Sequence, residues 1–153
     1  MFTDQWFEED TPIYVHPKDP YKRVDCIQSS TPIRITLPTS NDQESKAVIL
    51  AESTTSVNLY ETMLPPRYYV PYTSINTIHL RPSQSTTECP YKGVAQYHHV
   101  VVGGKKYEDL VWWYRAPTAD CIPITGLRCF YSEKVDIWFK KGDGWRKLPK
   151  DTT

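Results

Sequence analysis

Two adjacent glycines near the middle of the chain constrain its fold most. Gly103-Gly104 stands between two runs of β-branched and aromatic residues, at positions 94–102 and 107–114. A type I′ turn needs positive φ at both central residues, so this pair predicts a two-residue β-hairpin. That turn length sets the strand register, and we expect Val102 to lie opposite Lys105.

The same register places a histidine opposite a carboxylate on each face of the hairpin. We expect His99 opposite Glu108 and His98 opposite Asp109. Each pair can act as an acid–base dyad, because a carboxylate fixes the tautomer of the imidazole. The alternative, which is the commoner arrangement, is an ion pair between strands that contributes about 0.2–1 kcal/mol.

A sharp turn is predicted just before the hairpin, at Cys89-Pro90-Tyr91-Lys92-Gly93. Pro90 fixes its own φ, and Gly93 permits a bend that other residues resist. The turn would hold Lys92 at the mouth of a strand, where side chains can converge on a ligand. The alternative is a structural turn that carries a surface lysine.

The rest of the chain is also rich in β-forming residues. Prolines number 13, and no long segment repeats with the period of a helix. The pattern indicates about ten short strands in antiparallel hairpins, which predicts a mostly β fold in a single small domain. We expect an N-terminal arm packed on the domain at 1–32, a β domain at 33–141 and a mobile tail at 142–153. The polar stretch 82–88 is expected to be a loop.

Charge and hydropathy argue against two classes of partner. The formal net charge is +0, and no run of five like charges occurs, which argues against a nucleic-acid partner. No stretch is long and apolar enough for a membrane span, and the acidic start lacks the features of a secretory signal. We therefore expect a cytoplasmic protein with no nucleic-acid or membrane partner.

The four cysteines do not form any Cys-x-x-Cys pair, so the sequence indicates neither a zinc knuckle nor a thioredoxin-type site. Cys121 and Cys129 can meet across a turn, but without an export signal we expect reduced thiols. The sequence also lacks a phosphate-binding glycine loop, a catalytic serine elbow and a cluster with metal-ligand spacing. We therefore expect no metal and no cofactor.

Aromatic residues on the predicted central strands are the main positive indication of function. They include Tyr68, Tyr69, Tyr97, Trp112 and Tyr114. A β-cup lined by such rings suits an apolar or aromatic ligand that a few polar groups orient. The alternative is that the rings belong to the hydrophobic core, as most such residues do.

Several short motifs lie between about residues 33 and 140. They include Ala51-Glu52-Ser53, Tyr69-x-Pro71, Cys89-Pro90-Tyr91-Lys92-Gly93-x-Ala95-x-Tyr97, Asp109-x-x-Trp112-x-Tyr114 and Ile124-x-Gly126. In these motifs the chain resembles the domain-of-unknown-function 427 family, and Trp112-Trp113-Tyr114-Arg115 resembles its fungal branch. The resemblance implies a β-tent-like domain, similar to methionine sulfoxide reductase B and the cereblon ligand-binding domain. Relatives with that fold often hold zinc on paired Cys-x-x-Cys motifs, which this sequence lacks, so we predict no zinc.

Three functions remain open from the sequence. The first is a cofactor-independent enzyme of the isomerase, cyclase or lyase type, acting on a small molecule of fungal secondary metabolism. The second is a non-catalytic module that binds a small ligand or a peptide. The third is a nucleotidyltransferase, a label sometimes given to the family, although the sequence shows neither a paired acidic metal site nor a phosphate loop. A homodimer is compatible with all three.

For the enzyme, we expect Lys92, Tyr97, Glu61 and Arg67 to converge in one cavity. Lys92 or Arg67 would stabilise developing negative charge, and Glu61 or Tyr97 would move a proton. The predicted ligand contacts are Tyr69, Tyr91, Trp112, Tyr114 and Cys89.

Overall fold

The computed structural model describes residues 5–8, 11–14, 23–40 and 45–150, and within them the chain forms antiparallel β-sheets. A two-stranded hairpin pairs β1 (Gln5–Glu8) with β2 (Thr11–Tyr14). A seven-stranded sheet has the order β3 (Val24–Gln28), β6 (Val57–Glu61), β7 (Arg67–Val70), β11 (Arg128–Phe130), β10 (Lys105–Tyr114), β9 (Gly93–Val102) and β8 (Leu80–Cys89). A four-stranded sheet has the order β13 (Gly144–Lys147), β12 (Asp136–Lys141), β4 (Ile33–Thr36) and β5 (Ile49–Ser53). The predicted mostly β, antiparallel, single-domain fold is confirmed.

Short 3₁₀ segments connect some of the strands. They are η2 (Tyr72–Ser74), η3 (Thr77–His79) and η4 (Ala119–Ile124). In the part of the chain that the structure describes, no helix has the length and apolar character needed to cross a membrane.

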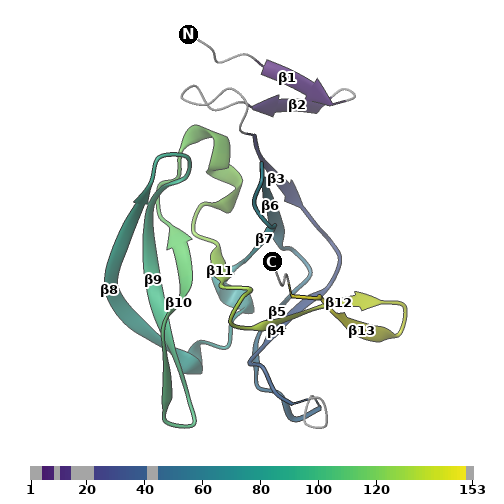
Figure 1. The fold of residues 1–153 in the computed structure, drawn as a ribbon, viewed down its shortest axis with the longest axis vertical. Helices are drawn as coiled ribbons and strands as arrows, with labels where there is room; N and C mark the ends of the chain where they lie inside the picture. The colour runs from purple at the N-terminus through teal and green to yellow at the C-terminus, as the bar shows by residue number, and fades with distance from the viewer. Residues whose placement is uncertain (1–4, 9–10, 15–22, 41–44, 151–153) are drawn as a thin grey trace.

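The seven-stranded sheet is strongly curved. Figure 1 shows β8, β9 and β10 in one wing and β3, β6 and β7 in the other, with β11 between them. The four-stranded sheet packs on one face of this sheet, where Ile35 of β4 shares a buried cluster with Val70, Val111 and Phe130. These contacts form the first part of the hydrophobic core.

The second part of the core lies on the opposite face, which we call the inner face. Side chains alternate between faces along a strand, so the residues adjacent to those of the first cluster point the other way. Tyr69, Trp112 and Cys129 accordingly belong to a separate buried cluster, together with Leu59 of β6. The two wings therefore enclose a surface lined by their own aromatic and sulfur-containing side chains.

The central hairpin follows the predicted register only near its turn. Val102 lies opposite Lys105, as expected, but beyond Tyr107 two extra residues in β10 shift the pairing, and His98 lies opposite Val111. The expected facing of His98 and Asp109 is therefore wrong. A β-bulge explains the shift.

Asp109 lies at that bulge with a φ of 50°. Its backbone N–H donates a hydrogen bond to Nδ1 of His99 at 3.0 Å, and its carboxylate accepts one from the hydroxyl of Ser83. His99 therefore lies beside Asp109 rather than pairing with Glu108 as the sequence predicted, with 3.4 Å between Nδ1 and Oδ1.

The polar stretch 82–88, which the sequence predicted to be a loop, instead forms most of strand β8. Thr86 and Glu88 pair with Gln96 and Val94 of β9. β8 is the edge of the sheet, where proline is tolerated, and most of its side chains are exposed. Alternation of apolar residues is absent from such a strand, which is why the sequence pattern did not reveal it.

The ordered β structure extends past both predicted domain boundaries. Strand β3 lies within the expected arm at 1–32 but belongs to the seven-stranded sheet. Strand β13 lies within the expected mobile tail, and the N–H of Leu148 donates to the carbonyl of Ile137 at 2.7 Å. The arm's segments 1–4, 9–10 and 15–22 and the tail's last residues, 151–153, lie outside the described residues.

Candidate functional site

One row of side chains crosses the inner face from wing to wing. Val57 lies opposite Tyr69, Tyr69 opposite Cys129, Cys129 opposite Trp112, and Trp112 opposite Tyr97. Residues directly opposite each other in a ladder share a face, so all five side chains point inward. The row places Tyr97 of one wing on the same surface as β6 of the other.

An ion pair joins the two wings above this row. Lys92, in the turn between β8 and β9, places Nζ 2.5 Å from Oε1 of Glu61 at the end of β6. Three strands separate β9 from β6 in the sheet, so the contact requires the curvature seen in Figure 1. The side chains are only 13% and 5% exposed, respectively. The predicted meeting of Lys92 and Glu61 is thus present in the structure.

The segment that follows β10 hydrogen-bonds to the turn that carries Lys92 and holds it in place. Thr118 donates its N–H to the carbonyl of Lys92 at 3.0 Å and its hydroxyl to the carbonyl of Tyr91 at 2.7 Å. Gly93 has a φ of 115°, and a Cβ there would lie 3.2 Å from the carbonyl oxygen of Ala116. Only glycine suits this conformation and this close approach. The backbone therefore fixes the point from which the Lys92 side chain extends toward Glu61.

Arg67 lies on the same face but has a different partner. Its guanidinium binds both carboxylate oxygens of Glu133, with Nη2 3.1 Å from Oε2, and it donates to Oγ of Ser132 at 3.0 Å. The charged group also lies 5.2 Å from the ring centre of Trp112 and 5.8 Å from that of Tyr131. The hydrogen bonds from Arg67 lower the pKa of Glu133 to about 2.

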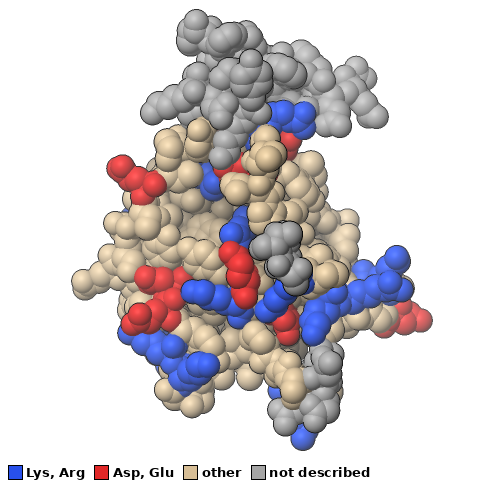
Figure 2. All heavy atoms as spheres, viewed as in Figure 1, with Lys and Arg blue, Asp and Glu red and all other residues tan. Residues whose placement is uncertain are grey.

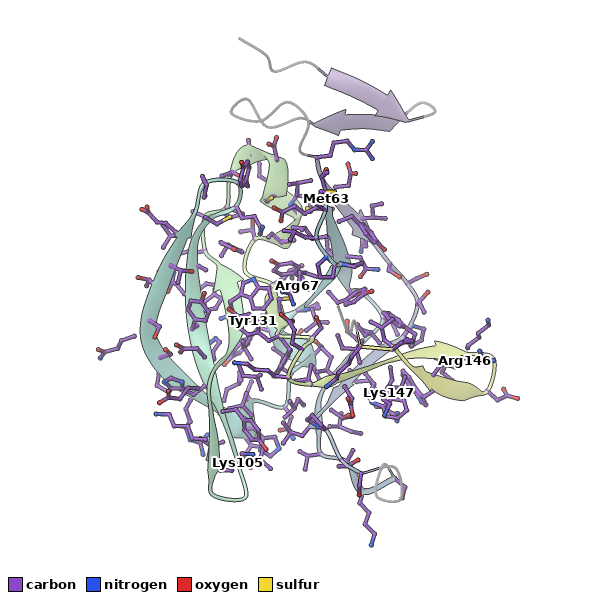
Figure 3. The ribbon with its side chains drawn as sticks, viewed as in Figure 1. Met63, Arg67, Lys105, Tyr131, Arg146 and Lys147 are labelled. Atoms are coloured by element: carbon purple, nitrogen blue, oxygen red, sulfur yellow. The ribbon has the colours of Figure 1, made fainter. Side chains whose placement is uncertain are left out.

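Figure 3 places Arg67 and Tyr131 between the two wings. In Figure 2 this side of the molecule is hollowed there, and basic and acidic atoms meet near its centre. Arg67 and Tyr131 thus line the exposed part of the inner face.

The hydroxyl of Tyr97 pairs with that of Thr87 on the neighbouring strand, with 2.8 Å between Tyr97 Oη and Thr87 Oγ1. Burial, together with the contact to Tyr97, raises the pKa of Tyr131 to about 12. The ring of Tyr131 packs against that of Trp112, with 4.5 Å between centroids. The hydroxyl of Tyr131 is therefore a protonated donor at neutral pH.

Three of the predicted ligand contacts are core residues. Tyr69, Trp112 and Tyr114 are 0%, 6% and 4% exposed, and the indole Nε1–H of Trp112 donates to the hydroxyl of Tyr69 at 3.0 Å. Burial raises the pKa of Tyr69 and of Tyr114. These rings form the floor of the inner face, while the partly exposed Tyr91 and Cys89 lie at the turn that holds Lys92.

The family model for the domain of unknown function DUF427 matches residues 25–141. The chain belongs to the DUF427 family. Apart from Val24, the matched region includes all strands of the seven-stranded sheet, together with Lys92, Glu61 and Arg67. No curated protein matches the sequence.

The DUF427 domain also contains site residues that the sequence did not single out. Glu133 and Tyr131 follow β11, in a segment with no motif that marks them as partners of Arg67 and Tyr97. The sequence allowed Cys121 to meet Cys129 across a turn; in the structure the thiol of Cys121 donates a hydrogen bond to the carbonyl of Tyr91 at 3.8 Å. All four cysteines are free thiols. Among the described residues, no group of three or more His, Cys, Asp or Glu side chains is placed to share a metal ion.

A groove of about 700 Å³ lies beside Glu133. Its floor is largely apolar and its rim carries Glu133 and Lys150. The full lining is Pro65, Pro66, Tyr68, Ser132, Glu133, Val135, Ile137, Leu148, Pro149 and Lys150. The groove therefore adjoins the Arg67–Glu133 pair and not the Lys92–Glu61 pair.

Proposed function

We propose that the DUF427 domain is a cofactor-independent enzyme that binds a small organic molecule at the inner face and moves a proton on it. The observation that carries this proposal is the Lys92–Glu61 pair, which is almost fully buried where the wings converge. A buried ion pair is often no more stabilising than an apolar pair of the same size. Charged groups held away from water are instead common at functional sites.

The chemistry that fits the pair is proton transfer next to a carbonyl group. The Glu61 carboxylate accepts a proton from the carbon, and the Lys92 ammonium neutralises the oxyanion that develops. The tyrosine hydroxyls of residues 97 and 131 orient polar groups of the substrate, and the aromatic floor excludes water. Isomerases, cyclases and lyases share this step. Following the fungal-type motifs, we assign the substrate to secondary metabolism.

Hydrogen–deuterium exchange tests the proposal without knowledge of the substrate. The protein is incubated in D₂O with a panel of β-diketones, β-keto acids and aryl ketones, and loss of the acidic C–H signals is followed by NMR. We expect at least one class to exchange about 100-fold faster than without protein. Glu61→Gln should abolish the effect, whereas Glu52→Gln, in the more exposed pair with Arg34, should retain it. Equal rates for wild type and Glu61→Gln, or no exchange in any class, would contradict the proposal.

The groove beside Glu133 favours a second candidate, a non-catalytic binding module. Its volume of about 700 Å³ lies within the range of about 300–1,000 Å³ typical of ligand pockets. Titration with the fluorescent probe 1-anilinonaphthalene-8-sulfonate tests it. We expect Tyr68→Ala to weaken binding at least tenfold if the groove is the site, and Glu61→Gln to leave binding unchanged.

Nucleotidyl transfer has no supporting constellation among the described residues. Such enzymes use acidic side chains to hold a divalent ion, and the described residues contain no group of three or more such ligands. Calorimetry with MgATP tests this reading, and we expect no heat of binding.

A further inference from the structure

A second row of side chains crosses the outer face, by which we mean the face of the seven-stranded sheet opposite to the inner face. Arg128 lies opposite Trp113, Trp113 opposite Gln96, and Gln96 opposite Thr86. Paired residues share a face, and the first three members are each adjacent in sequence to a member of the inner row, so their side chains point outward. None of them has a part in the proposed proton transfer.

The guanidinium of Arg128 is held by aromatic rings and neutral acceptors. Its central carbon lies 4.0 Å from the ring centre of Trp113 and 4.5 Å from that of Tyr72. Nη1 donates to the carbonyl of Gly126 at 2.5 Å, and Nε donates to Nε2 of His98 at 3.4 Å. Burial lowers the pKa of His98, and so does the charge of Arg128, so the imidazole is neutral at neutral pH and can accept this bond. Nη2 of Arg128 has no hydrogen-bond partner among the described residues.

A second arginine contacts the same indole ring. The guanidinium carbon of Arg115 lies 5.4 Å from the ring centre of Trp113, and its Nη2 lies 3.5 Å from Oε1 of Gln96. Within the described chain, neither Arg115 nor Arg128 forms an ion pair with a carboxylate. Glu88 shares the outer face, opposite Val94, but it pairs with neither arginine. The cluster therefore holds two cations without a carboxylate partner.

The other two arginines that contact aromatic rings in the described chain both have such a partner. Arg34 lies 4.1 Å from the ring centre of Trp145 and pairs with Glu52 at 3.3 Å, while Arg67 pairs with Glu133. A contact with a ring is thus combined with an anion at those two positions. Partial removal of a cation from water without an anion costs free energy, which an anionic ligand would offset.

We propose that Arg128, Arg115 and Tyr72 form a second binding site, on the outer face, for a small aromatic carboxylate. The carboxylate accepts hydrogen bonds from Nη2 of Arg128 and from Arg115, because planar guanidinium and carboxylate groups match in geometry. The ring of the ligand lies against Tyr72, which is 43% exposed. A monoanion fits better than a dianion, since Glu88 adds negative charge to the same face.

NMR titration of the ¹⁵N-labelled full chain with benzoate tests the proposal. We expect benzoate to shift the Nε–H signal of Arg128 and the indole N–H signal of Trp113. Acetate, which lacks the ring, and benzamide, which lacks the charge, should each bind at least about tenfold more weakly. Phenyl phosphate, a dianion, should also bind more weakly than benzoate.

Arginine variants locate the site. Arg128→Gln should weaken benzoate binding at least about tenfold, because it removes the charged edge. Arg115→Gln changes an exposed side chain and should weaken binding at least about threefold, so it keeps the test decisive if Arg128→Gln fails to fold. Arg34→Gln is the matched control: it removes an arginine that contacts a ring but already has a carboxylate partner, and it should leave the affinity unchanged.

Several results would overturn the proposal. They are an absence of binding to wild type, an equal loss of affinity in Arg34→Gln and Arg115→Gln, an equal affinity for acetate, and a higher affinity for phenyl phosphate. None of these outcomes depends on whether Glu61 transfers protons.

Discussion

The ammonium of Lys92 and the carboxylate of Glu61 meet across the curved sheet, although 31 residues separate them in the chain. Neither residue lies within the strand centres that build the core. Lys92 lies in a turn and Glu61 is the last residue of β6, so the pair connects the ends of two wings. This connection makes the same contact relevant to both stability and function.

Replacing one member of the pair should destabilise the fold strongly. Lys92→Met leaves the Glu61 carboxylate buried without its ammonium partner, and we expect a loss of about 3–5 kcal/mol in the free energy of unfolding. The double variant Lys92→Met/Glu61→Leu should recover most of that loss. Urea denaturation measures both values.

The matched control is the more exposed pair of Arg34 and Glu52, 3.3 Å apart. Glu52→Ala should cost about 1 kcal/mol or less, because water screens that interaction. If Lys92→Met costs as little as Glu52→Ala, the Lys92–Glu61 contact does not hold the wings together.

Much of the inner face follows from the sequence, even where the predicted register was wrong. The bulge at Asp109 shifts the pairing by two residues, and a shift of two leaves the paired side chains beyond the bulge on their original faces. Tyr97, Trp112 and Tyr114 therefore share a face, as alternation along the two strands requires. The bulge itself depends on Ser83 and His99, which belong to other strands, so no local pattern could reveal it.

The partners within the site were less predictable. The Cys-Pro-Tyr-Lys-Gly turn identified Lys92, because proline and glycine mark a bend locally. The pairing of Arg67 with Glu133, and the hydrogen bond from Cys121 to the carbonyl of Tyr91, join residues from distant segments. Such contacts arise from the curvature of the sheet and the placement of η4, which strand periodicity does not encode.

The ionisation of Glu133 should make the free energy of unfolding depend on pH. Its pKa falls from 4.5 to about 2 in the folded state because Arg67 hydrogen-bonds to the charged form. The stabilisation that the Arg67–Glu133 pair gives to the folded state is therefore complete above pH 4.5 and is lost as the pH falls toward 2. The side chain is 61% exposed, so we expect less than about 1 kcal/mol. Urea denaturation across this range should show a shallower loss for Glu133→Gln than for wild type, and identical slopes would contradict the assignment.

Gly93 should tolerate no side chain. Gly93→Ala imposes a φ of 115° on alanine and brings its Cβ to 3.2 Å from the carbonyl of Ala116. We expect a loss of more than about 2 kcal/mol. Gly104→Ala is the control: its φ is also positive, at 79°, but no atom lies within 4 Å of the added Cβ, so strain alone should cost about 1 kcal/mol. Thermal and urea unfolding of both variants decide whether the close approach matters, since equal losses would attribute the effect to φ alone.

The buried hydrogen bond between Trp112 and Tyr69 should act as a core contact. Tyr69→Phe removes the acceptor of the indole N–H, and Trp112→Phe removes the donor while leaving a buried hydroxyl, so we expect each to cost about 1–3 kcal/mol. The double variant should lose less than the two single losses together, because it leaves neither polar group without its partner. Urea denaturation of the four proteins gives this coupling energy. An unchanged unfolding midpoint for Tyr69→Phe would instead favour the sequence-based prediction, in which the hydroxyl of Tyr69 faces a ligand and adds nothing to the fold.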